Sequence, residues 1–111
     1  MMSAPDSGEA RVLLDLRRLA DRPGLSATGE VSLSTRPAWQ SALEEMLVQG
    51  SDIYLDLSGL SFVDVGGAGA LARAAQRLPA PGRIVLSGPP ASLRRTLDLF
   101  WPDLEAIEVT K

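Results

Sequence analysis

The most constraining feature of the sequence is an apolar strand that leads through a glycine-rich segment into a helix, within residues 53–78. Residues 53–57 have the composition of a strand, and their apolar character continues almost to Val63. Such near-continuous apolar runs are typical of central strands that are covered on both faces. The glycines of residues 64–69 then predict a tight turn. The alanines and leucines up to Leu78 predict a helix that packs closely on the sheet.

The rest of the chain alternates strand-like and helix-like segments. Residues 11–16 and 25–31 alternate apolar and polar side chains, which predicts a hairpin around a turn at residues 21–24. Beyond this hairpin, the pattern predicts a helix after each strand until a last short strand closes the chain. The helices are expected at residues 37–49, 70–78 and 93–100, and the further strands at residues 53–57, 83–87 and 107–109.

Helical spacing identifies the side chains that are expected to be buried. They are Trp39, Leu43, Met46 and Leu47, then Leu71, Ala74, Ala75 and Leu78, and finally Leu93, Leu97 and Phe100. Ser34 or Thr35 is expected to cap the first helix and Ser92 the third. Trp101, after the third helix, either covers the core or lies exposed. Residues 1–10 are small and polar and are expected to form a disordered tail. We predict one α/β domain over residues 11–111, with a mixed sheet of about five strands and three helices packed on it.

Composition limits the functions open to this domain. The chain has 111 residues, 14 of them acidic and 11 basic, and it contains no histidine and no cysteine. The missing residue types exclude histidine-based triads, Cys/His zinc sites, iron–sulfur clusters and disulfides. The acidic balance argues against nucleic-acid binding. No apolar run approaches the roughly 18 residues of a membrane span, and the first residues do not resemble a signal peptide. We expect a cytoplasmic protein without metal or cofactor that inserts into no membrane.

The glycine-rich segment is the main candidate for a functional site. A helix that begins there would present free N–H groups to an anion or to a partner chain. The segment lacks the Gly-Lys-Ser/Thr ending of a Walker loop and the glycine spacing of a dinucleotide fingerprint. It also holds no nucleophile, base or lysine, so no catalytic residue is predicted. Asp56 and Asp64 suggest an acid/base pair or a metal site, but bonds from Asp64 to helix N–H groups explain its position better.

Several separated motifs resemble those of STAS domains, which occur in bacterial anti-sigma factor antagonists, in stressosome proteins and at the ends of sulfate transporters. The motifs are Asp56-Leu57-Ser58, Phe62-Val63-Asp64, Gly67 and Leu71, and Gly29-Glu30-Val31 at the end of the second expected strand. The order of the elements also matches, from about residue 11 to residue 110. The resemblance implies that residues 11–111 form a STAS domain.

The resemblance also implies a site and a partner. In the classical antagonists, the residue after the second aspartate is a phosphorylated serine, and here it is Val65. Valine cannot accept the charge of about −1.5 to −2 that phosphorylation adds. Val65 is therefore identified as a pseudo-phosphosite that mimics the unphosphorylated, binding-competent surface of an antagonist. The implied partner is a kinase-type anti-sigma factor in partner switching. The implied partner-binding residues are Asp64, Val65, Gly66, Gly67, Ala68, Gly69 and Arg73.

Two alternatives come from the same residues. The Gly66-Gly67 pair is similar to the Asp-Thr-Gly-Gly-Leu turn of the STAS subunit of lipid-asymmetry ABC transporters, with Val65 in place of the threonine and Ala68 in place of the leucine. The partner would then be the transporter ATPase.

The phosphate could also go to another hydroxyl. The candidates are Ser58, Ser61 and Thr35, all of which have a structural explanation as hydrogen-bond partners of backbone groups or as a helix cap.

Arg73 and Arg77 are expected to point away from the buried stripe of their helix, toward a partner or toward solvent. Many STAS domains carry a further C-terminal helix that this sequence lacks. Its absence would leave a sheet edge open to a partner or to a second copy of the chain.

Overall fold

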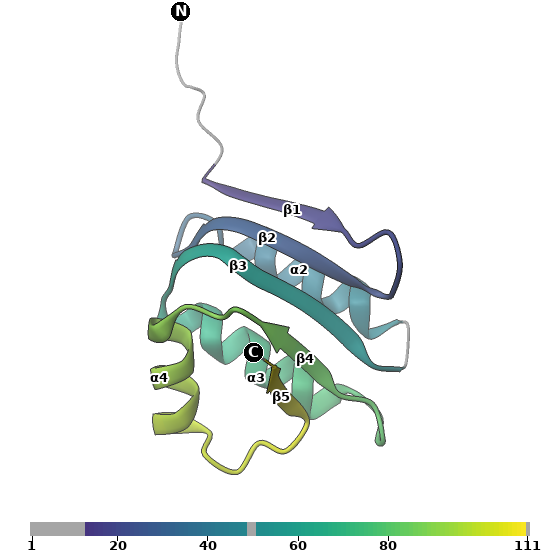
Figure 1. Ribbon diagram of the computed structural model, residues 1–111. Coiled ribbons are helices and arrows are strands. Elements are labelled where there is room, and N and C mark those ends of the chain that lie inside the picture. The colour runs from purple at the N-terminus through teal and green to yellow at the C-terminus, as the bar shows by residue number, and fades with distance from the viewer. Residues whose placement is uncertain (1–12, 49–50, 111) are drawn as a thin grey trace, which may run out of the picture.

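The computed structural model describes residues 13–48 and 51–110. Within them, a five-stranded mixed sheet is packed with three helices (Figure 1). The strands are β1 (Leu14–Arg18), β2 (Gly24–Val31), β3 (Ile53–Val63), β4 (Ile84–Ser87) and β5 (Ile107–Thr110). The helices are α2 (Arg36–Leu47), α3 (Val65–Arg77) and α4 (Ala91–Phe100). The predicted α/β class, element order and mixed sheet are confirmed.

The strands lie in the sheet in the order in which they follow along the chain. β1 is antiparallel to β2, and every later pair is parallel. Right-handed crossovers that all advance in one direction place their helices on the same side of the sheet, and α2 and α3 lie together behind the strands in Figure 1. The expectation that β3 is covered on both faces is therefore wrong. Its side chains alternate instead between buried Leu55 and half-buried Tyr54 and Asp56.

β3 is also longer than the predicted strand of residues 53–57. Its pairing with β2 shifts register near Thr28 and Gly59, which marks an irregularity in the strand rather than its end. An extra residue of this kind lets a strand continue while it changes which side chains face inward. Leu57 and Leu60 are both buried for this reason, although they are three positions apart.

The core lies between the sheet and the helical layer. The buried side chains from the helices are Trp39, Leu43 and Met46 of α2, the predicted inner face of α3, and Leu93 and Leu97 of α4. Phe100 was expected in this group, but 56% of it is exposed. α4 ends at Phe100, and half-buried Trp101 packs against the core in its place. The two rings meet edge to face, with 5.9 Å between their centroids.

Some predicted boundaries differ from the structure. The first strand reaches Arg18 rather than Leu16. Ser92 does not cap α4, because the N-cap position is Pro90 and the Ser92 hydroxyl accepts the Val63 N–H at 3.2 Å. That bond ties the first turn of α4 to the end of β3. The expected tail at residues 1–10 lies outside the described residues. The first helix, predicted to run to Gln49, ends at Leu47 with Val48 as its C-cap. In residues 13–48 and 51–110, none of the helices has the length and apolar character of a membrane span.

Candidate functional site

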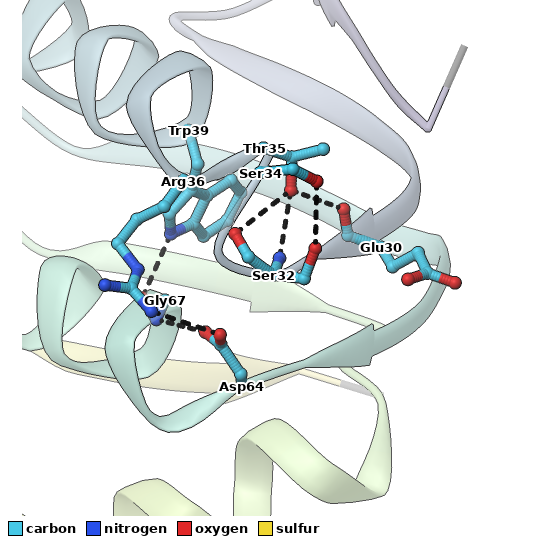
Figure 2. Close-up of polar contacts among 8 residues, drawn as sticks. All are labelled: Glu30, Ser32, Ser34, Thr35, Arg36, Trp39, Asp64 and Gly67. Carbon is cyan, nitrogen blue, oxygen red and sulfur yellow. Dashed lines mark hydrogen bonds and ion pairs between the residues drawn. The ribbon is translucent and has the colours of Figure 1, made fainter. Parts of the chain in front are cut away.

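Asp64 organises the start of α3. It is the N-cap residue, and its Oδ1 accepts the Gly67 N–H at 2.7 Å. Its Oδ2 accepts a hydrogen bond from Arg36 Nη2 at 3.2 Å (Figure 2). The first bond satisfies one of the free N–H groups that open every helix. The prediction that Asp64 bonds N–H groups at the start of the helix is confirmed.

The glycine-rich segment is helix rather than the predicted tight turn. Because Asp64 caps α3 directly, Val65 is already helical and no separate turn is needed. A Cβ on Gly66 would lie 2.2 Å from the guanidinium carbon of Arg36, and one on Gly67 would lie 2.5 Å from Val31 Cγ1. These two glycines therefore make room for a side chain of α2 and for a side chain of the sheet.

Two residues of α2 fix the position of α3. The indole Nε1 of fully buried Trp39 donates to the Gly67 carbonyl oxygen at 3.0 Å. Arg36 lies over Gly66 and binds Asp64, while its buried Nε has no hydrogen-bond partner among the described residues. Figure 2 shows both side chains reaching from α2 toward the start of α3. Sequence reasoning did not identify Arg36, since the contact joins residues 28 positions apart and no local pattern signals it.

Only part of the predicted partner-binding set reaches the surface. Val65 is 56% exposed and Arg73 is exposed, while Asp64 and Gly66 are half-buried. The remaining predicted residues, Gly67, Ala68 and Gly69, are buried in this chain. Of the predicted set, Val65 is thus the one aliphatic side chain exposed at the start of α3, where the capped helix end holds it.

A second exposed aliphatic residue lies at the same end of the sheet. Val31 of β2 and Val63 of β3 are partners in the parallel register. Leu33 and Val65 each follow one of these partners by two residues, so both lie where the two strands end. Leu33 is 75% exposed. Nothing in the local sequence pattern distinguished Leu33 from a core leucine.

The loop before α2 uses its hydroxyls differently from the prediction. Thr35 occupies the N-cap position of α2 but makes no side-chain cap bond. Its hydroxyl donates to the Glu30 carbonyl oxygen at 2.9 Å and accepts the Ser32 N–H at 2.9 Å (Figure 2). Ser34 makes no cap bond either, so the prediction that one of the two caps α2 is wrong. The Thr35 hydroxyl holds the loop onto the end of β2 instead.

Ser58 and Ser61 are both engaged in hydrogen bonds. The Ser58 hydroxyl donates to Asp56 Oδ1 at 2.7 Å, and the Ser58 N–H donates to the same oxygen at 3.1 Å. These two bonds favour the ionised carboxylate and lower the pKa of Asp56 from its ordinary value. The Ser61 hydroxyl donates to the Gly29 carbonyl oxygen at 3.2 Å. Asp56 and Asp64 thus have separate partners, and the described part of the chain contains no group of three metal-ligating side chains.

Fold and site together define a small α/β domain whose principal feature is a capped helix start with an exposed aliphatic residue. The sequence matches the family model described as "Mlab, STAS domain" over residues 14–101. The chain therefore belongs to the STAS domain family, as its motifs indicated. No curated protein matches the sequence.

Solved structures share this fold at low sequence identity. An anti-sigma factor antagonist from Mycobacterium paratuberculosis matches with a TM-score of 0.69 and 22% identity, over 86% of this chain and 84% of that chain. The anti-sigma factor antagonist SpoIIAA in its unphosphorylated form matches with a TM-score of 0.64 and 19% identity, over 88% and 87% of the two chains. The phosphorylated Bacillus SpoIIAA matches with a TM-score of 0.64 and 20% identity, over 88% and 91%.

Proposed function

We propose that residues 11–111 form a non-catalytic interaction domain that binds a kinase-type anti-sigma factor in the cytoplasm. The fold shared with anti-sigma factor antagonists supports a role in partner switching. The observation that carries the proposal is exposed Val65 at the first position of α3, beside the Asp64 cap. A rigidly held aliphatic side chain at a helix start suits an interface that loses water on binding.

Val65 also determines how we propose that binding is regulated. Valine offers no oxygen for a phosphoryl group, so this position keeps its apolar surface whatever the kinase activity of the partner. Thr35, Ser58 and Ser61 already donate hydrogen bonds within the described residues. The domain therefore acts as a constitutive antagonist that stays competent to bind.

The test is binding of the purified kinase-type anti-sigma factor from the same genome, measured by isothermal titration calorimetry. Val65→Asp is expected to raise the Kd by about 100-fold, because an interface would bury the new carboxylate without a partner. Leu99→Asp is the matched control, since Leu99 is exposed in the last turn of α4, whereas the first turn of α4 is the one bonded to the end of β3. Equal affinities for Val65→Asp and the unaltered chain would contradict the proposal.

A second variant tests directly whether the missing hydroxyl at position 65 prevents phosphorylation. Val65→Ser supplies the missing hydroxyl at the same exposed position. Incubation with the anti-sigma factor and ATP is expected to add one phosphate to this variant and none to the unaltered chain, as measured by intact mass. Phosphorylation of the unaltered chain under these conditions would show that another hydroxyl is the regulated one.

A second candidate function is supported by the matched family model and by the glycine pair. The model is described as "Mlab, STAS domain", and Gly66-Gly67 resembles the turn of the STAS subunit of lipid-asymmetry ABC transporters. The partner would then be the transporter ATPase. Titration of the domain with the ABC ATPase of the same genome separates the two functions, because each predicts binding to only one of the two proteins.

A further inference from the structure

The helices α2 and α3 enclose a groove on the surface of the helical layer. The groove contains a hollow of about 170 Å³. α2 lines it with Gln40, Leu43, Glu44 and Leu47, and α3 lines it with Ala70, Arg73, Ala74 and Arg77. The alanines keep the α3 side low, so the hollow lies between longer polar side chains at its rim, above Leu43, Ala70 and Ala74, which are themselves buried.

The groove continues the surface at the start of α3. In a helix, residues four positions apart lie on the same face, one turn from each other. One turn before Gln40 lies Arg36, and one turn before Ala70 lies Gly66. Arg36 lies against Gly66 just beyond this end of the groove, next to exposed Val65. A partner that covers Val65 would therefore extend naturally along the groove.

The charges along the groove are unevenly paired. Arg36 binds Asp64, and Arg77 Nη1 lies 3.6 Å from Glu44 Oε2. Arg73 lies between these two pairs, is exposed, and makes no ion pair within residues 13–48 and 51–110. The groove thus carries one unpaired positive charge at its middle, although the chain as a whole has a net charge of −3.

We propose that this groove receives an amphipathic helix of the protein partner. An apolar side chain of that helix enters the hollow between Leu43 and Ala74, and a carboxylate pairs with Arg73. The two ridges of side chains from α2 and α3 repeat with helical spacing, which is the geometry that a third helix packs into. The inference rests on the proposed function, because it assigns a second contact to the same partner.

Charge reversal at Arg73 tests the contact in the complex with the anti-sigma factor. Arg73→Glu is expected to raise the Kd about tenfold or more, since it sets two carboxylates against each other. The variant keeps the fold, because a glutamate four residues before Arg77 is a favourable helical pair. Arg95→Glu is the control, as Arg95 is exposed on α4 and makes no ion pair in the described ranges.

The outcomes separate the groove from the proposed function. If Val65→Asp abolishes binding while Arg73→Glu and Arg95→Glu both leave the Kd unchanged, the groove proposal is overturned and the proposed function stands.

If the anti-sigma factor does not bind the unaltered chain, the proposed function fails and the groove is tested in the native host. A photo-crosslinking residue at Gln40, compared with one at exposed Ser41, then has to capture an acidic amphipathic helix, and Arg73→Glu has to abolish the adduct. Absence of that adduct overturns the groove proposal.

Discussion

Two connections at the same end of the sheet lead from a strand into a helix, and they are built differently. After β2, four residues separate Val31 from α2, and the Thr35 hydroxyl bonds back to Glu30. After β3, Asp64 alone separates the strand from α3 and caps the helix directly. The first connection is thus held to the strand that precedes it, and the second to the helix that follows it.

The difference shows which of the two helix starts is fixed by the rest of the molecule. α3 begins against α2, because Arg36 binds Asp64 and Trp39 binds the Gly67 carbonyl. The loop before α2 relies on its own residues, 30–35, for its side-chain hydrogen bonds. A surface whose position is set by two helices loses little conformational freedom on binding, which supports our proposal that the start of α3 contacts the partner.

The largest expected effect is a difference in stability between alanine variants at two glycines of α3. Gly67→Ala places a methyl group 2.5 Å from Val31 Cγ1 and is expected to destabilise the protein by about 1–3 kcal/mol through overpacking. Gly69→Ala is the matched control, because its Cβ would meet nothing closer than 3.3 Å and alanine favours a helix by up to about 1 kcal/mol. Urea denaturation measures both. Equal stability of the two variants would show that α3 is less closely packed than described.

The next largest effect is the loss of stability on replacing the N-cap residues of α3 and α2. Asp64→Ala removes a cap bond and an ion pair and is expected to cost about 1–2 kcal/mol. Thr35→Ala removes two loop bonds at a position that makes no cap bond, and about 0.5–1.5 kcal/mol is expected. Thermal denaturation of the two variants shows which substitution costs more stability. The comparison is wrong if Thr35→Ala proves the more destabilising of the two.

The smallest effect concerns Asp56, on the part of β3 remote from either connection. The pKa of Asp56 is lowered in the folded state, so its ionised carboxylate stabilises the fold at pH values above the ordinary carboxyl pKa of about 3.9. This stabilisation is lost as the pH falls through the folded-state pKa. Ser58→Ala removes the hydroxyl bond, which is the main cause, and is expected to raise the pKa of Asp56 toward its ordinary value. NMR titration of the Asp56 carboxyl carbon checks this, with Ser61→Ala as the control.

Local patterns were sufficient for the elements and for one part of the site. Strand alternation and helical spacing predicted the order of all eight elements. An aspartate before a helix predicted that Asp64 accepts from N–H groups at the helix start, and the N–H is that of Gly67. Trp39 was correctly placed in the core, because its spacing with Leu43 and Met46 is that of a buried helix face.

The failures arose where tertiary packing decides between local options. Ser92 has the composition of a cap, but its hydroxyl accepts from Val63, 29 residues earlier. The glycines at residues 66–67 have the composition of a turn, but neighbouring side chains fill the space that larger residues would need. Arg36 had no local signal, since its role depends on where α2 lies beside α3. Such contacts require the assembled layers and cannot be read from a window of sequence.

The order of the strands in the sheet has a consequence for how the chain folds. Because each strand pairs only with its neighbours in sequence, every βα unit can dock on the unit made just before it. Each parallel pairing closes a loop no longer than one βα unit, so less entropy is lost before the transition state than if strands farther apart in the sequence were paired. During synthesis, the β1–β2 hairpin emerges before β3, β4 and β5 and can serve as the template on which they are added in turn.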